Sequence, residues 1–154
     1  MQIQRDDLSH PAVIALLHEH LKDMRTNSPP ESVHALDLDA LRKPDVTFWT
    51  VWKEDQVAGC GALKELDSNH GEIKSMRTSG LFRRRGVAVL MLKHIVDEAR
   101  TRQYQRLSLE TGAQDFFKPA HALYAAHGFE VCGPFANYKN DPNSVFMTLS
   151  LDRR

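Results

Sequence analysis

Three consecutive arginines followed by a glycine, in the segment RRRGVA at residues 83–88, have the clearest chemical meaning in this sequence. The apolar pattern predicts a strand before the segment and a helix after it. A helix start carries unpaired N–H groups and the positive end of the helix dipole, which together suit an anion. Gly86 lets the backbone approach a phosphate closely, and guanidinium groups match phosphate geometry. The segment therefore predicts a phosphate-binding turn. It lacks the Gly-Lys-Ser/Thr ending of a P-loop and the three-glycine spacing of a dinucleotide-binding motif, so neither of those sites is predicted.

The elements around this turn follow from hydrophobic periodicity and from turn residues. Strands are predicted over residues 1–7, 46–53, 57–66, 72–78, 106–111, 129–132 and 144–151. Helices are predicted from a cap at Ser9 to a break at residues 27–30, and over residues 31–42, 88–99 and 117–127. A strand, a helix and a strand between residues 72 and 111 form a βαβ unit with parallel strands, and the strands before it form an antiparallel meander. The expected fold class is α/β, with a mixed, mostly antiparallel sheet, about four flanking helices and a central parallel βαβ unit.

Length and composition favour one soluble globular domain over residues 1–154, with 42% apolar and 26% charged residues. Lys plus Arg and Asp plus Glu both number 20, a balance that argues against nucleic acid as a partner. No apolar run approaches the ~20 residues of a membrane span, and the first residues contain no signal-peptide pattern. We therefore expect a cytoplasmic protein with no membrane partner, whose two cysteines are reduced. His18 and His20 lie two residues apart on a helix, so their side chains diverge and no metal site is expected.

Two motifs make the chain resemble the GNAT superfamily of N-acetyltransferases. Members bind the pyrophosphate of coenzyme A with Q/R-x-x-G-x-G/A at such a strand-to-helix junction, and Arg83, Gly86 and Ala88 match it. Members also carry Leu-Tyr-x-x-x-Gly-Phe further along the chain, which residues 123–129 match. Gly80 and Phe117 depart from the pattern, because many members have proline and asparagine at these two places. The resemblance implies a GNAT-like fold and acetyl-CoA as cosubstrate, bound by Met76, Arg77, Thr78, Arg83, Arg84, Arg85, Gly86, Val87 and Ala88.

Acetyl transfer from a thioester to an amine needs a base for the amine proton and a donor for the leaving thiolate. Glu72 is the candidate base, because several GNAT branches place a glutamate at that offset before the motif arginine. Glu110, acting through water, is a second candidate, and bulk water is a third. Tyr124 is the candidate acid, and the resemblance implies that the backbone N–H of Met76 stabilises the oxyanion.

The acceptor of GNAT proteins enters opposite the cofactor, between the first two helices and the late hairpin. Here these segments are residues 24–32, His34 and residues 138–144, of which Tyr138, Asn143 and Ser144 could line a polar pocket. The segments SPPESVHAL and DPNSVFM resemble those of a bacterial GNAT subgroup, a resemblance that names no acceptor. We expect a primary amine on a small-molecule or amino-acid-like acceptor, with a homodimer left open. The alternatives are a coenzyme A-binding sensor and a protein or tRNA acetyltransferase. The neutral charge disfavours tRNA, and a wide acceptor cleft would favour a protein.

Overall fold

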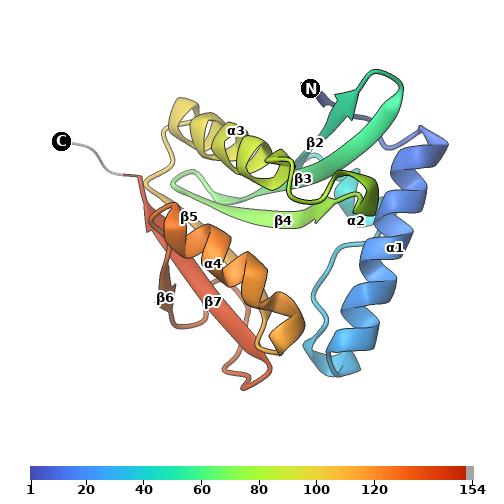
Figure 1. Cartoon of the computed structure of the whole chain (residues 1–154). Helices are drawn as coiled ribbons and strands as arrows, with labels where there is room; N and C mark the ends of the chain where they lie inside the picture. Colours follow the sequence, from blue (N-terminus) through green and yellow to red (C-terminus); the bar gives the residue numbers. More distant parts are fainter. Residues whose placement is uncertain (152–154) are drawn as a thin grey trace.

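The computed structural model describes residues 1–151 and arranges their strands in one mixed sheet with helices on both faces (Figure 1). The strands, in sheet order, are β1 (Gln2–Arg5), β2 (Val46–Lys53), β3 (Gln56–Asp67), β4 (His70–Thr78), β5 (Arg106–Gly112), β7 (Ser144–Ser150) and β6 (Glu130–Cys132). The helices are α1 (Pro11–Asn27), α2 (Leu38–Leu41), α3 (Val87–Thr101) and α4 (Lys118–Ala126). Three single 3₁₀ turns, η1 (Pro30–Ser32), η2 (Gly80–Phe82) and η3 (Asp115–Phe117), precede α2, α3 and α4. No helix of the part described is long and apolar enough to cross a membrane.

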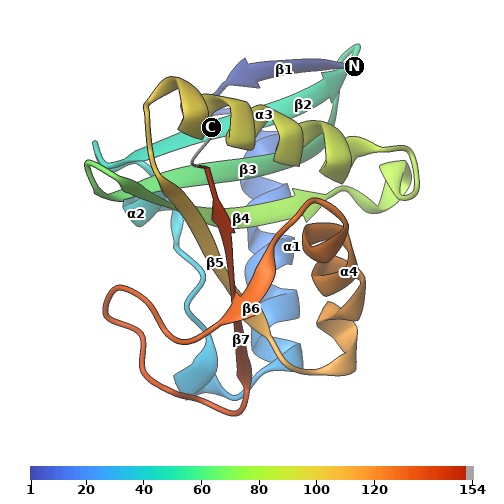
Figure 2. The same ribbon diagram turned by 90° about the vertical axis from the view of Figure 1, so that its left-hand side faces the viewer.

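The strand pairing confirms the predicted topology. Strands β1 to β4 are antiparallel neighbours, β4 and β5 are parallel, and β7 pairs antiparallel with both β5 and β6. The parallel pairing joins only His70 to Arg106, Gly71 to Leu107 and Glu72 to Ser108. Beyond Glu72 and Ser108 the two strands diverge, and β5 and β7 run off at a steep inclination to β4 (Figure 2). The sheet is therefore split by a wedge that opens toward the carboxyl ends of β4 and β5.

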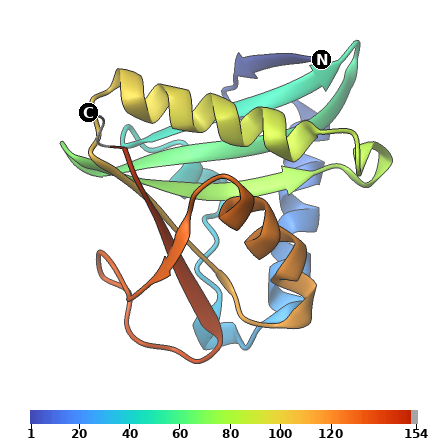
Figure 3. The ribbon, with the colours of Figure 1, turned by 60° about the vertical axis from the view of Figure 1, so that its left-hand side comes forward.

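The two faces of the sheet carry separate cores. Helices α1 and α2 pack on one face through Val13, Leu16, Leu17 and Leu41, against apolar side chains of β2 and β3. Helices α3 and α4 cover the other face (Figure 3), where Leu92 and Ile95 are fully buried. Gly61 on β3 permits this close packing, because a Cβ there would lie 2.7 Å from Met91 and 3.0 Å from Ile95. Helix α3 is thus held closely against β3, the neighbour of β4 in the sheet.

Two local predictions were wrong. The helix predicted over residues 31–42 is the η1 turn, an extended stretch and the short helix α2, because Asp37 accepts a hydrogen bond from the Ala40 N–H and starts a new helix there. Ser9 does not cap α1. The ring Nδ1 of His10 accepts the hydrogen bond from the Ala12 N–H instead, and the Ser9 hydroxyl donates to Asp7.

Candidate active site

A β-bulge in β4 shapes one side of the wedge. Cys60 pairs with Arg77 and Ala62 pairs with Lys74, so Ser75 and Met76 together oppose the single residue Gly61. Ser75 has a φ of 57°, in the left-handed region that non-glycine residues seldom adopt. A bulge removes residues from the regular ladder and bends the strand. The Met76 backbone therefore lies at an irregular point of β4, on the edge that β5 has left.

A cavity of about 290 Å³ fills the wedge and brings together residues from both faces of the sheet. Arg83, Phe117, Tyr124 and Met76 of β4 line it on the side of α3 and α4. Its other side is lined by His20, Met24, Ser28, Ser32 and His34, with Lys74, Ser75, Arg77 and Glu110 from the strands. The cavity thus contains most of the residues predicted to act on the thioester.

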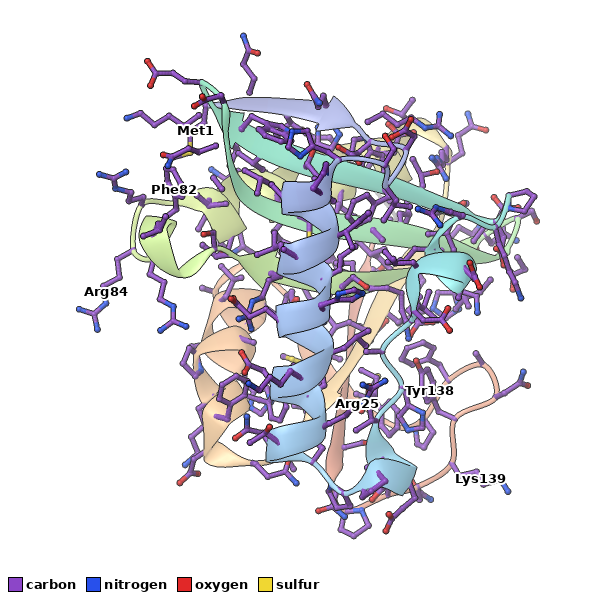
Figure 4. All side chains as sticks on the ribbon, turned by 90° about the vertical axis from the view of Figure 1, so that its right-hand side faces the viewer. Met1, Arg25, Phe82, Arg84, Tyr138 and Lys139 are labelled. Carbon is purple, nitrogen blue, oxygen red and sulfur yellow. The ribbon has the colours of Figure 1, made fainter. Side chains whose placement is uncertain are left out.

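The start of α3 has the geometry expected of an anion site. Gly86 is its N-cap with a φ of 80°, and no atom lies within 4 Å of a Cβ placed there. The first N–H groups of a helix have no partner inside it, so those that follow Gly86 are available to a ligand. Arg83 lines the cavity, Arg85 lies over the Phe82 ring, and Arg84 projects away from the body of the protein (Figure 4). The structure therefore brings Arg83, and not Arg84, to the wedge.

The structure does not bring Glu72 into this cavity. Glu72 is 2% exposed, and its Oε2 accepts a hydrogen bond of 2.5 Å from the Tyr138 hydroxyl. Lys74 Nζ lies 3.4 Å from the same oxygen and donates to the Tyr138 hydroxyl (2.9 Å) and to the His34 carbonyl (3.0 Å). This cluster lines a second cavity of about 560 Å³, bounded by the loop 136–141. The Glu72 carboxylate is therefore engaged with protein groups, and it lines the second cavity, which shares His34 and Lys74 with the first.

Glu110, the second candidate base, lines the first cavity. Its Oε2 accepts a hydrogen bond of 2.8 Å from the Ser144 hydroxyl. Burial raises the pKa of the Glu110 carboxyl above its ordinary value, and the nearby charge of Glu72 adds to the increase. The Ser144 hydrogen bond and the charges of His34 and Lys74 act in the opposite direction. A carboxylate with a raised pKa accepts a proton more readily, which suits a general base.

Tyr124 points from α4 toward the same cavity. The residue is 6% exposed, and its ring packs edge-on against Phe129 with centroids 5.5 Å apart. Burial raises the pKa of the phenol, so the hydroxyl stays protonated at neutral pH and remains a donor. Phe117 lines the cavity beside Tyr124. The Phe117 ring packs so closely on Gly112 of β5 that a Cβ at Gly112 would lie 2.2 Å from it.

Comparison with known proteins decides the family of this fold and site. The family model described as "Acetyltransferase (GNAT) family" matches residues 13–129. The chain belongs to the GNAT acetyltransferase family. The N-acetyltransferase YsnE of Bacillus subtilis is 58% identical over 151 residues, which cover 98% of this chain and 100% of that protein. Acetyl-CoA is accordingly the cosubstrate of this GNAT protein.

Solved GNAT structures agree with the fold over nearly the whole chain. A Klebsiella pneumoniae structure that carries the name of an acyl-CoA N-acyltransferase superposes with a TM-score of 0.83 at 28% identity and covers 98% of this chain and 97% of that one. A GNAT acetyltransferase from Elizabethkingia anophelis, solved with acetyl-CoA bound, has a TM-score of 0.72 at 18% identity and covers 97% of each chain.

Sequence reasoning missed several polar residues of this GNAT site. His20, Lys74 and Ser75 line the cavity, although no motif marks them. Arg77, expected at the cofactor, also lines the cavity, but its guanidinium is paired with Glu19 and Asp23 of α1. Periodicity does not mark these residues, because His20 is the one polar residue among the buried positions of α1 and the bulge at Ser75 and Met76 breaks the alternation of β4. His20 is buried and His18 is exposed on α1, and within residues 1–151 no three His, Cys, Asp or Glu side chains form a group that could hold a metal.

The Gly86 turn carries a first testable expectation. Acetyl-CoA at ~100 times its dissociation constant should stabilise the fold by about 2.7 kcal/mol, measured as a higher melting temperature. The Gly86→Glu variant should lose most of this stabilisation, because glutamate is strained at a φ of 80° and repels phosphate. Gly133→Glu is the matched control, since no atom lies within 4 Å of a Cβ there and its φ is ordinary. Equal acetyl-CoA affinity of both variants in calorimetry would place the pyrophosphate elsewhere.

Proposed function

We propose that this protein transfers the acetyl group of acetyl-CoA to the primary amine of a small molecule by direct attack on the thioester. The single observation that carries the proposal is the common cavity of Met76, Glu110 and Tyr124, beside the α3 turn. The amine nitrogen attacks the carbonyl carbon, and the carbonyl electron pair moves to oxygen as the N–C bond forms. When the pair returns, the C–S bond breaks and the thiolate leaves.

Three groups of the chain have roles in this step. Glu110 takes the amine proton, directly or through water, and Ser144 fixes the orientation of its carboxylate. The N–H of Met76, at the bulge, donates to the developing oxyanion, a contact that is typically worth ~3 kcal/mol. Tyr124 donates a hydrogen bond to the leaving sulfur. Because burial raises the phenol pKa, Tyr124 stabilises the thiolate by this hydrogen bond more than by complete proton transfer.

The acceptor side is closed by contacts between two loops, which supports a small acceptor. The Ser32 hydroxyl donates to Asp141 at 2.5 Å, and the rings of His34 and Tyr138 meet edge-on at 5.0 Å. The Tyr138 side chain extends from the loop before β7 toward the segment after η1 (Figure 4). The cavity of about 290 Å³ must also hold the acetyl group and the adjoining thioester, and, among the residues described, further room for an acceptor lies only in the second cavity of about 560 Å³ described above, which shares His34 and Lys74 with it. A peptide segment would need these contacts to separate.

A thiol-release assay with acetyl-CoA tests the proposal. Small primary amines should be acetylated, and peptides that offer the same amine should react at least about tenfold more slowly, because the loop contacts are worth roughly 1 kcal/mol each. Faster reaction of peptides would contradict the small-molecule assignment. Binding of acetyl-CoA without turnover of any amine would favour the sensor function.

A further inference from the structure

We propose that Lys74, His34 and Tyr138 form a partition that limits the acceptor to short amines. This inference rests on the proposed function and names the length of the amine that it uses. The first cavity, of about 290 Å³, holds the reacting groups, and the second, of about 560 Å³, adjoins it. Within residues 1–151, His34 and Lys74 are the residues that line both cavities. Room for a longer acceptor therefore lies next to the active site, on the far side of these two residues.

The partition is a closed ring of contacts between three segments of the chain. Lys74 extends from β4, and its ammonium donates to the His34 carbonyl at 3.0 Å and to the Tyr138 hydroxyl at 2.9 Å. The rings of His34 and Tyr138 meet edge-on with centroids 5.0 Å apart. Tyr138 reaches the other two residues from the loop before β7 (Figure 4). Each member contacts the other two, so β4, the segment after η1 and this loop are joined at one point.

Tyr138 is held in the ring of contacts from two sides. Its hydroxyl donates to Glu72 Oε2 at 2.5 Å while it accepts from Lys74. Burial and the charge of Glu72 raise the pKa of Tyr138, so the hydroxyl stays protonated at neutral pH and keeps both bonds. The Tyr138 ring packs on Phe135 and Phe146, with centroids 5.1 Å and 5.4 Å away. A ligand cannot displace this tyrosine without breaking polar and apolar contacts together.

The charges at the partition oppose its opening. The side chains of Lys74 and Glu72 are 9% and 3% exposed, and they lie 3.4 Å apart. A charge so little exposed depends on its counter-charge and on its hydrogen-bond partners. A tail that entered between Lys74 and Tyr138 would have to replace these partners, and each hydrogen bond is typically worth a factor of about 2–10 in an equilibrium constant. An amine that must cross the partition should therefore react more slowly than one that ends before it.

The second cavity would accept a polar tail if the partition were open. Lys64, Asn137 and Asn140 line it and do not line the first cavity. Their ammonium and amide groups can donate hydrogen bonds to ether and hydroxyl oxygens. Exclusion of a long polar amine would thus reflect the partition, and neither a lack of room nor a lack of polar partners.

Three amines of increasing length test the inference on the unaltered protein: ethanolamine, aminoethoxyethanol and aminoethoxyethoxyethanol. They share the amine end and a terminal hydroxyl, and they differ in the number of ethoxy units. At equal concentrations of the unprotonated amine, kcat/KM should fall about tenfold or more from the shortest to the longest, because the tail displaces at least one hydrogen bond of a charged donor. Equal or rising values along the series would overturn the inference and leave the acetyltransferase function intact. Acetyl-CoA binding with turnover of none of the three would instead contradict the proposed function.

Opening the partition should restore the long amine. The double variant Lys74→Ala with Glu72→Gln removes the ammonium and leaves no carboxylate buried without its counter-charge. Its ratio of kcat/KM for the longest amine to that for the shortest should rise about tenfold or more above the parent ratio. A ratio within one variant cancels losses of folded protein, and it also cancels the change in Glu110, whose pKa depends on the charges of Lys74 and Glu72. An unchanged ratio in the folded double variant would overturn the inference.

A milder variant and a matched control complete the test. Tyr138→Phe keeps the packed ring but loses the hydroxyl that links Lys74 to the loop, so the same ratio should rise about threefold. Lys64→Ala is the control, because Lys64 lines the second cavity and takes no part in the partition. The control should keep the parent ratio. An equal rise in Lys64→Ala and Tyr138→Phe would show that the second cavity, and not the partition, sets the acceptor length, and would overturn the assignment.

Discussion

Replacing Glu110 by glutamine is expected to lower the single-turnover rate of acetyl transfer by about 10²–10³-fold, the range of a lost general base. Glutamine keeps the size of the side chain and can still hydrogen-bond to Ser144, but it cannot accept the amine proton. Acetyl-CoA affinity, measured by calorimetry, should stay near the parent value, because Glu110 is on the acceptor side of the wedge. Glu72→Gln is the informative comparison. Glu72 is engaged with Tyr138 and Lys74 and does not itself line the cavity, so its loss should change the rate far less.

The pH profile distinguishes the two glutamates further. The rate requires the ionised form of Glu110, whose folded-state pKa is raised by burial. Activity should therefore increase with pH through an ionisation above the ordinary carboxyl pKa of about 4.3, and it should fall as the pH drops below that ionisation. The Glu110→Gln variant should lose this rise of activity with pH. The Glu72→Gln variant should keep the rise but show it at lower pH, because the negative charge that helps to raise the Glu110 pKa is gone. If the Glu72→Gln variant lost the rise of activity with pH and the Glu110→Gln variant kept it, Glu72 would be the base.

Removal of the Tyr124 hydroxyl is expected to have the next largest effect, a fall in the single-turnover rate of about 10²-fold. Tyr124→Phe keeps the ring that packs against Phe129, so the melting temperature and acetyl-CoA affinity should change little. Single-turnover measurement is needed because slow product release can hide a change in the chemical step. Tyr104→Phe is a suitable control, since that buried tyrosine donates to Glu65 at 2.6 Å and lies outside the cavity. A parent-like rate for Tyr124→Phe would remove the donor role.

The fold was predictable because its main elements are specified locally. The apolar spacing of α3 and the β-branched and aromatic run of β2 each indicate one type of element, and the βαβ rule then fixes β4 and β5 as parallel neighbours. The segment between residues 31 and 42 was mispredicted, because its conformation depends on distant contacts. The His34 carbonyl accepts a hydrogen bond from Lys74, and Ser32 bonds to Asp141. Neither partner is visible in a local window of sequence.

The lining of the candidate site was predictable where a motif marks a residue, as for Tyr124 and Arg83. Gly86 begins α3 in the left-handed conformation that its motif suggests. The choice between Glu72 and Glu110 depends on which side of the wedge each carboxylate faces, and that is set by the divergence of β4 from β5. That His20 on α1 and Ser75 and Arg77 on β4 line one cavity could not be predicted either, because the position of the bulge in β4 depends on pairing with β3.

The three-residue parallel pairing of β4 and β5 has a consequence for how the chain acquires activity during folding. Residues 1–101 supply β1 to β4 with three of the helices, and the later residues supply β5 to β7 with α4, so the halves are successive stretches of chain. Neighbouring strands within each half are close in sequence, which favours fast pairing, whereas the core on the α3 and α4 face joins residues of both halves. Glu110 and Tyr124 belong to the second half, and Met76 and the α3 turn belong to the first. With the roles proposed for these residues, acetyl transfer requires both stretches of the chain to be docked, so activity reports on their association across the wedge.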